Sequence, residues 1–235
     1  MTGEDEWAAL AAAVPSLFHP LQVGVGVSAV GDPVVGEPVV GGEPAQEGTI
    51  LAGTAGPARR AEFAAGRLAA RRALTSFLGS ATSLGRAANG AVAWPEEVDG
   101  SLAHTRGAAV AIVTGRGYGI GIDLEETGAA TASRAALTRS LTEWERADVA
   151  AGPAPELAAL AAFCAKEAIY KCLPPEVQPG RSFQEVTLRG LSSIGLGCTR
   201  LGLAAPTLPK ALTAALTVTV CHAGGYLVAG AWYPR

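Results

Sequence analysis

The chain has 235 residues, of which 49% are hydrophobic and 17% are charged, and this composition excludes an intrinsically disordered protein. The net charge of −3 gives no reason to expect nucleic-acid binding, and no apolar run is long enough to span a bilayer. The acidic start, MTGEDEWAAL, is unlike a signal peptide, so we expect a cytoplasmic protein. Its four cysteines are expected to be buried and reduced: Cys164, Cys172, Cys198 and Cys221.

The first third of the chain predicts two helices around one strand. A short helix is expected over residues 7–14, and the alternation VGVGVSAV predicts a strand over 23–30. Residues 31–58 are rich in Gly, Pro and Glu and predict a long loop. Residues 59–79 predict a helix that ends at Gly79.

Arginines gather along the flank of the 59–79 helix. They are Arg59, Arg60, Arg67, Arg71 and Arg72. Such a column is either a solvated face whose stems cover apolar surface or a phosphate-binding wall, because guanidinium groups pair well with phosphate. The residues alone leave both interpretations open.

Two apolar runs in the middle of the chain predict strands over 108–113 and 119–124. The short loop between them, with Gly115 and Gly117, indicates a hairpin. His104 stands just before the first of these strands, at an element end where ligands commonly bind. A lone histidine in such a position is also compatible with a purely structural role.

The last hundred residues predict helices followed by strands. Thr142 and Glu145 have the spacing of a capping box, and a helix should follow to about residue 151. A second helix is expected over 155–173, where Pro174 ends it. Further strands are expected over 183–188, 212–220 and 226–232, the last two joined by a hairpin turn at 222–225.

Asp123 and Glu125 lie one residue apart at the end of the 119–124 strand. Strand alternation points both carboxylates the same way. Two carboxylates that close repel each other unless a cation or a proton lies between them, and oxygen ligands suit Mg²⁺. The alternative is that the two acids only end a strand and begin a solvated loop.

Glu167 and Lys171 lie on the stripe of the 155–173 helix that Leu160 and Cys164 mark as core-facing. Charges are rarely buried without a partner or a ligand. We therefore predict that Glu167 is a third metal ligand and that Lys171 meets an anion beside it. The alternative is an ordinary i,i+4 surface pair.

Four motifs, in this order and spacing, resemble those of the 4′-phosphopantetheinyl transferases. They are RRAEFAAGR (59–67), SLAH (101–104), GIDLE (121–125) and FCAKEAIYK (163–171). Within this family the chain is most similar to the larger Sfp-like, or enterobactin-synthetase component D-like, group, which serves siderophore, polyketide and nonribosomal peptide biosynthesis. The resemblance covers roughly residues 55–190.

The resemblance implies an α+β fold. It would be a pseudo-twofold pair of similar α/β subdomains, each a small antiparallel sheet packed on a long helix. We expect an N-terminal half over residues 1–117 with the arginine-rich helix, and a C-terminal half over 118–235 with the acidic site and the catalytic helix. Coenzyme A would lie in the cleft between the halves, and a monomer is expected.

The resemblance also implies roles for individual residues. Asp123, Glu125 and Glu167 are expected to hold Mg²⁺, with Mn²⁺ as an alternative ion. The residues expected to contact coenzyme A are Arg59, Arg67, Arg86, His104, Lys166 and Lys171. The expected catalytic residues are Glu167 as general base, with Lys171 and Asp123. Ala103 departs from the family, which commonly has Ser or Thr there; a lost hydroxyl contact of about 1 kcal/mol predicts weaker coenzyme A binding.

The implied reaction is the Mg²⁺-dependent attack of a serine hydroxyl, on an apo acyl or peptidyl carrier protein, at the β-phosphate of coenzyme A. Its products are the phosphopantetheinyl carrier and 3′,5′-ADP. One alternative is a non-catalytic coenzyme A-binding regulatory or scaffold protein. Another is a different Mg²⁺-dependent phosphoryl-transfer enzyme, which the absence of a GxxxxGK[ST] loop and of kinase motifs disfavours.

Overall fold

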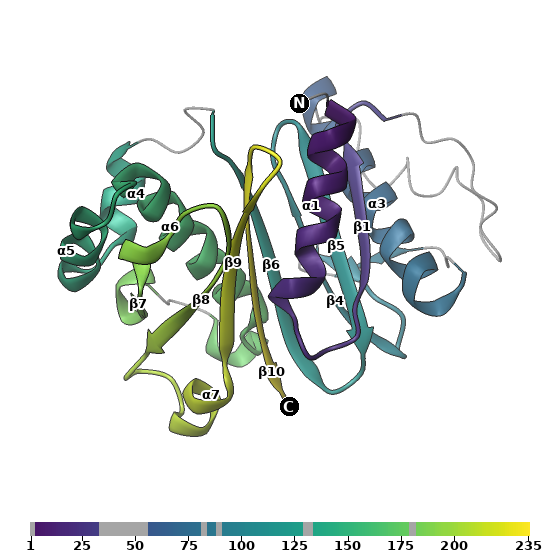
Figure 1. Cartoon of the computed structure of the whole chain (residues 1–235). Helices are drawn as coiled ribbons and strands as arrows, with labels where there is room; N and C mark the ends of the chain where they lie inside the picture. The colour runs from purple at the N-terminus through teal and green to yellow at the C-terminus, as the bar shows by residue number, and fades with distance from the viewer. Residues whose placement is uncertain (1–2, 33–55, 81–83, 88–90, 129–133, 179–181) are drawn as a thin grey trace. The chain divides into compact units, whose positions relative to one another are not determined.

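The computed structural model describes residues 3–32, 56–80, 84–87, 91–128, 134–178 and 182–235 (Figure 1). This part of the chain forms two units. The smaller unit is Leu21–Gly117, and the larger unit combines Met1–Pro20 with Tyr118–Arg235. A boundary therefore falls between Gly117 and Tyr118, where the sequence predicts one. The loop predicted over 31–58 lies almost wholly outside the described residues.

The smaller unit packs one long helix on a three-stranded antiparallel sheet with the order β1-β5-β4. Its elements are β1 (Gly24–Ala29), α3 (Pro57–Leu78), β4 (Val98–His104) and β5 (Ala108–Gly115), with a short ribbon of β2 (Gly85–Arg86) and β3 (Val92–Ala93). α3 ends at Gly79 as predicted, because that residue adopts the left-handed conformation with a φ of 77°.

Small residues let α3 lie close to its sheet. A Cβ on Gly24 or Gly26 of β1 would meet backbone atoms of α3, at the carbonyls of Ala73 and Ala69. Ala69 and Ala73 are themselves fully buried in the core beneath the helix. Glycine and alanine are thus required here by close backbone approach.

The larger unit is built on a five-stranded antiparallel sheet with the order β6-β10-β9-β8-β7. Its strands are β6 (Tyr118–Glu126), β7 (Thr187–Arg189), β8 (Gly197–Ala204), β9 (Thr217–Ala223) and β10 (Tyr226–Pro234). Its helices are α1 (Gly3–Leu17), α4 (Arg134–Ser140), α5 (Glu143–Ala151), α6 (Pro155–Cys172) and α7 (Lys210–Ala215), with short 3₁₀ turns η1 (Pro175–Val177), η2 (Phe183–Glu185) and η3 (Leu191–Ser193).

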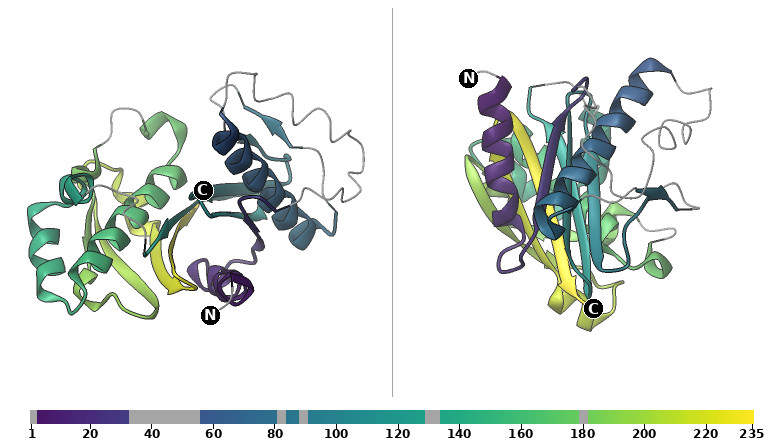
Figure 2. Two further views of the ribbon diagram at one scale, coloured as in Figure 1. Left: turned by 90° about the horizontal axis from the view of Figure 1, so that it is seen from above. Right: turned by 90° about the vertical axis from the view of Figure 1, so that its right-hand side faces the viewer.

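Helix α6 packs along β6 and β10 of this sheet (Figure 2). The contact is closest at Gly121, where a Cβ would meet the carbonyl oxygen of Ala168 and lie 2.7 Å from the backbone nitrogen of Cys172. Alternation then turns Gly121, Asp123 and Glu125 toward the same face as α6. This register confirms that the two carboxylates share a face.

Helix α1 packs on β9 and β10, on the other face of the sheet. Gly230 of β10 lies opposite Ile122, so it faces away from Gly121, and a Cβ there would lie 2.7 Å from Leu17 and 2.8 Å from Phe18. Residues 1–20 therefore belong to the larger unit. Their expected place in the N-terminal half is wrong, because the apolar face of α1 is buried by the C-terminal strands.

The predicted α+β class, with two subdomains that each pack an antiparallel sheet on a long helix, is confirmed. The helices predicted over 155–173 and after Thr142 are also present, and both halves of the capping box form. The hairpin of β9 and β10 turns at Gly224 and Gly225, which both have positive φ.

Three predictions about strands are wrong. The runs 108–113 and 119–124 do not form a hairpin, since β5 pairs with β1 and β4 while β6 pairs with β10. Residues 212–215 are helical in α7, and residues 183–185 form η2. Strands β4 and β8 were missed because glycine and polar residues interrupt their apolar alternation.

The expectation of four reduced cysteines is also wrong. Cys198 and Cys221 lie directly opposite each other on β8 and β9, and the structure joins them in a disulfide. Cys164 and Cys172 are buried and free, as expected. Among the described residues, no helix has both the length and the hydropathy required to cross a membrane.

Gly121→Ala should lower the free energy of unfolding by about 1–3 kcal/mol, because the added methyl group forces α6 away from β6. Urea unfolding measures the loss. Gly128→Ala is the matched control, since a Cβ at Gly128 meets nothing within 4 Å. Equal stability of the two variants would contradict the close approach at Gly121.

Candidate active site

Three carboxylates gather between β6 and α6 of the larger unit. Asp123 and Glu125 come from β6, and Glu167 comes from the facing turn of α6. After burial, the charge of Asp123 raises the pKa of both Glu125 and Glu167, and the charge of Glu167 also raises the pKa of Glu125. The three acids that the sequence predicts as metal ligands thus lie near enough for their charges to interact.

Lys171 balances part of this negative charge. Its Nζ donates to Asp123 Oδ1 at 2.6 Å and to the carbonyl oxygen of Ile122 at 3.2 Å. The lysine side chain is 30% exposed and the aspartate side chain 11%. Lys171 therefore pairs with an acid on β6, and the alternative of a simple i,i+4 surface pair with Glu167 does not describe it.

Glu125 and Glu167 hold their protons more tightly than free glutamates do. Burial first, and then the charges of Asp123 and Glu167, raise the pKa of Glu125 to about 7. Burial and Asp123 likewise raise the pKa of Glu167, while Lys171 acts in the opposite direction. The single positive charge of Lys171 thus does not balance the negative charges of three carboxylates. A second cation would offset the remaining negative charge.

Asp123 carries a further sign of an incomplete site. Its Oδ2 is buried and has no hydrogen-bond partner among the described residues. A buried acceptor without a partner is costly, and a hard oxygen donor of this kind fits a divalent cation such as Mg²⁺. In the same part of the chain, however, no three His, Cys, Asp or Glu side chains are close enough together to hold a metal ion as they stand.

Cys164 closes the site on the core side. Its thiol is fully buried and lies 3.7 Å from the carbonyl oxygen of Leu227, to which it donates. Burial, and then the nearby charges of Asp123 and Glu125, raise the pKa of this thiol well above its ordinary value. A hydrogen bond with Asp123 acts in the same direction, and Cys164 is therefore a neutral neighbour of the acids.

In the smaller unit, the structure brings Arg59 and His104 together. Arg59 Nη1 lies 3.4 Å from His104 Nε2 and 3.4 Å from Glu62 Oε2. The arginine side chain is 59% exposed. Two of the residues predicted to bind phosphate thus form one exposed basic cluster, at the start of α3 and the end of β4. Glu62 was not predicted to contact it.

Arg67 has a different setting from Arg59. It is buried, and its Nη1 donates to the carbonyl oxygens of Leu84 at 3.1 Å and Gly85 at 2.8 Å. Burial, and then the neighbouring charge of Arg86, lower the pKa of Arg67. Arg67 thus anchors the backbone that leads into Arg86, which is exposed on β2.

Other arginines of this column make contacts within the smaller unit or are buried in it. Arg72 Nη1 donates to the carbonyl oxygen of Val27 at 2.6 Å and lies 3.4 Å from Asp32 Oδ2, and Arg71 is 7% exposed. The column is therefore neither a uniformly solvated face nor a continuous phosphate wall. Among the members described here, Arg59 is the one with an exposed guanidinium beside His104.

The structure changes the expected consequence of Ala103. Leu102 faces α3, where it lies 3.2 Å from a Cβ built on Gly66, and His104 shares that face by alternation. Ala103 therefore points to the opposite face of β4 from the Arg59–His104 pair. A hydroxyl at position 103 would not join this pair, so its absence does not weaken it.

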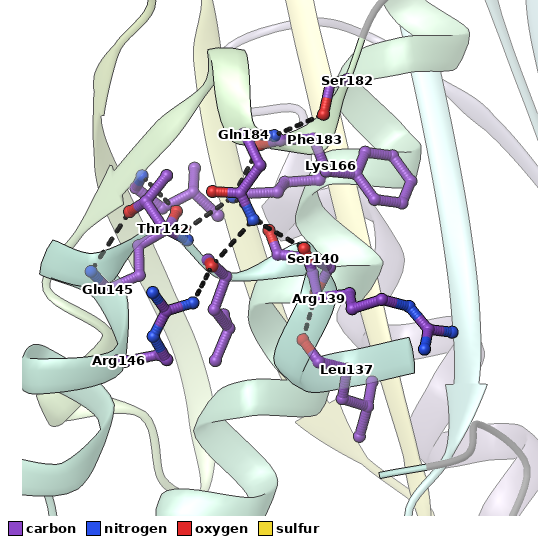
Figure 3. Close-up of polar contacts among 12 residues, drawn as sticks. Leu137, Arg139, Ser140, Thr142, Glu145, Arg146, Lys166, Ser182, Phe183 and Gln184 are labelled. Atoms are coloured by element: carbon purple, nitrogen blue, oxygen red, sulfur yellow. Dashed lines mark hydrogen bonds and ion pairs between the residues drawn. The ribbon is translucent and has the colours of Figure 1, made fainter. Parts of the chain in front are cut away.

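Lys166 does not have the role that the resemblance implies. Its side chain is 1% exposed, and Nζ donates to Ser140 O, Glu145 Oε2 and Phe183 O at 2.8, 2.7 and 2.9 Å (Figure 3). These contacts use all three of its donors. We therefore remove Lys166 from the predicted coenzyme A-binding residues, since no donor is left for a ligand.

Glu145 was interpreted from the sequence only as a helix cap. The structure shows in addition that it is fully buried as the partner of Lys166. Neither a capping-box glutamate nor a lysine on the buried face of a distant helix is, by itself, a strong sequence signal for a buried ion pair. Their pairing depends on how α5 packs against α6, which spacing along the chain does not reveal.

Two family models match the chain in succession. One, described as the 4′-phosphopantetheinyl transferase N-terminal domain, matches residues 46–114. The other, described as the 4′-phosphopantetheinyl transferase superfamily, matches residues 119–221 and so includes all three acids and Lys171. The chain belongs to the 4′-phosphopantetheinyl transferase superfamily, as its motifs predict.

The chain is also similar to enterobactin synthase component D of Salmonella austin. The two sequences are 31% identical over 145 residues, which cover 61% of this chain and 60% of that protein. The chain thus matches less than two thirds of the length of this relative. The similarity agrees with the enterobactin-synthetase component D-like group that the motifs predict.

Glu125 should make the stability of the protein depend on pH when no divalent cation is bound. Its folded-state pKa of about 7 lies above the ordinary value of 4.5, so between these pH values the folded protein holds a proton that the unfolded chain has released. The free energy of unfolding should therefore decline as the pH rises through this range. Urea unfolding at about pH 5 and about pH 7.5 should show a smaller decline in Glu125→Gln than in the parent. An unchanged decline would contradict the assignment, and Glu176→Gln, at an exposed acid, serves as the control.

Arg59 and Arg67 should respond differently to removal. Arg59→Ala should weaken coenzyme A binding about tenfold or more through loss of a charged hydrogen bond, with little change in stability. Arg67→Ala should lower the free energy of unfolding by about 1–3 kcal/mol, because it leaves the carbonyls of Leu84 and Gly85 without this donor. Calorimetric binding and urea unfolding on both variants test the contrast, and a reversed pattern would refute it.

Proposed function

We propose that this protein transfers the 4′-phosphopantetheine group of coenzyme A to a serine of an apo carrier protein and releases 3′,5′-ADP. The observation that carries the proposal is a charged cluster at the contact of β6 and α6. In it, Lys171 pairs with Asp123, and the charge of Asp123 acts on Glu125 and Glu167. This cluster lies within the stretch matched by the superfamily model. Acyl and peptidyl carrier domains are the proposed partners, and the cytoplasm is the proposed location.

The carboxylates are proposed to hold Mg²⁺, with Mn²⁺ as an alternative. Support comes from the buried Oδ2 of Asp123 without a partner and from the raised pKa of Glu125. When bound, the ion would neutralise the negative charge that develops on the pyrophosphate. Lys171 lies beside Asp123 and is proposed to pair with a phosphate oxygen next to the acids.

Glu167 is the proposed general base for the serine hydroxyl. Support for this role comes from the position of Glu167 among the acids, where burial and the charge of Asp123 raise its pKa in the metal-free protein. In the smaller unit, Arg59, Arg86 and His104 are proposed to contact phosphate groups of coenzyme A. Arg67, which the resemblance also implies as a contact, is left out of this set because it is buried against the carbonyl oxygens of Leu84 and Gly85. The exposed Arg59–His104 pair supports this part of the proposal.

The first experiment is mass spectrometry of a panel of apo carrier proteins incubated with this protein, coenzyme A and Mg²⁺. One phosphopantetheine should be added to at least one carrier, and EDTA should prevent the addition. Bound coenzyme A with no addition on any carrier would favour the alternative of a non-catalytic coenzyme A-binding protein. We separately predict that the protein is a monomer, which size-exclusion chromatography with light scattering would measure.

Asp123→Asn and Glu167→Gln should each lower kcat/KM for transfer by about a thousandfold or more, because a metal ion supplies several kcal/mol of transition-state stabilisation. Thermal unfolding should show that both variants remain folded. Glu176→Gln, at an exposed acid on η1, is the control and should retain full activity. Near-normal transfer by either site variant would refute the assignment of these acids.

A further inference from the structure

A buried ion pair lies next to the candidate site without being part of it. Lys166 and Glu145 have side chains that are 1% and 0% exposed, with Nζ and Oε2 separated by 2.7 Å. Besides Lys166, Glu145 accepts hydrogen bonds from the backbone nitrogens of Thr142 at 2.6 Å and Leu188 at 2.7 Å. The pair is fully hydrogen-bonded within the larger unit.

The partners of this pair come from separate segments. Lys166 is on α6, Ser140 ends α4, Glu145 is on α5, Phe183 begins η2 and Leu188 is on β7. Figure 3 shows the lysine side chain extending between the α4–α5 junction and η2. One ammonium group thus ties three segments to α6.

η2 is held to the same junction by a second residue. Gln184 Nε2 donates to the carbonyl oxygens of Arg139 at 2.6 Å and Leu141 at 2.9 Å (Figure 3). The ring of Phe183 meets the ring of Phe163 edge to face, with centroids 5.7 Å apart and planes at 87°. The position of η2 therefore sets the position of this aromatic contact.

Phe163 connects the pair to the acidic site. It lies four residues before Glu167 on α6, so the two side chains are on the same face, one turn apart. Lys166 itself is the residue next to Glu167. A rotation of α6 about its axis would change the side-chain direction of Glu167, and η2 contacts the same face of α6 through Phe163.

Stability alone is a weak explanation for such a pair. Burying two charges costs several kcal/mol, and well-packed apolar residues of similar volume often serve a core as well or better. Apolar contacts are not directional, whereas an ammonium group with three donors holds three acceptors in one geometry. This favours a role in fixing the orientation of α6 and η2.

We propose that Lys166 and Glu145 are positioning residues for the transfer reaction, holding α6 and η2 so that Glu167 keeps the orientation the chemistry needs. The proposal rests on the proposed function of the acidic site. Lys166 acts through its neighbours on α6 and through the Phe183–Phe163 contact. It does not touch coenzyme A, because its donors are all used within the protein.

The test compares the parent protein with the double variant Lys166→Met, Glu145→Gln, which removes both charges and leaves no lone buried ion. We expect kcat to fall about tenfold to a hundredfold, the loss typical of slight misplacement of a catalytic group, while the KM for coenzyme A stays within about twofold. Mn²⁺ affinity, measured by electron paramagnetic resonance without substrates, should fall about tenfold.

Leu201→Ala is the matched control for stability. Leu201 is buried in the core of the same unit, on β8, so its truncation lowers the melting temperature without touching the ion pair. With both variants assayed well below their melting temperatures, the control should keep the kcat and the Mn²⁺ affinity of the parent. Equal losses in the two variants, or no loss in the double variant, would overturn the proposal.

Two further variants keep the test decisive if the double variant does not fold. Gln184→Glu, on the exposed side of η2, removes the donor to Arg139 and Leu141, and Phe183→Ala removes the ring while keeping the carbonyl that Lys166 binds. Both should lower kcat and leave the KM for coenzyme A unchanged; full activity in both would refute the proposal. Failure of the proposed function is distinguishable, because the parent itself would then show no transfer to any carrier.

Discussion

The close approach of α6 to β6 at Gly121 is the contact on which the acidic site depends. Because Gly121 has no side chain, the backbone of α6 can lie directly against the strand. Alternation then places Asp123 and Glu125 opposite the helix face that carries Glu167 and Lys171. The same closeness buries Glu125 and places like charges beside it, and burial first and these charges second raise the pKa of Glu125.

The sequence was sufficient for elements whose signals are local. The capping box at Thr142, the helix stop at Gly79 and the hairpin turn before Tyr226 all depend on neighbouring residues, and all are present. Strand pairing is not local. A short glycine-containing loop between β5 and β6 suggested a hairpin, but β6 instead pairs with β10, about a hundred residues later, because that pairing completes the core under α6.

The same division applies to the functional residues. Asp123, Glu125, Glu167 and Lys171 could be predicted because two short motifs each place a charge on an otherwise apolar face. Arg67 could not be separated from Arg59, since both are arginines on one helix. Their difference lies in what surrounds them: the carbonyls of Leu84 and Gly85 enclose Arg67, whereas the guanidinium of Arg59 is exposed.

Two lysines on neighbouring turns of α6 show how a structural charge differs from a functional one. Lys166 has its three donors matched by protein acceptors, and its partner Glu145 is equally satisfied, so neither gains from a ligand. Lys171 also has a carboxylate partner, but that partner, Asp123, keeps a buried oxygen without a hydrogen bond and belongs to a cluster with excess negative charge. A second cation near Asp123 would offset the remaining negative charge, whether it binds alone or together with a phosphate group. This behaviour is expected of a site that binds a metal–phosphate substrate.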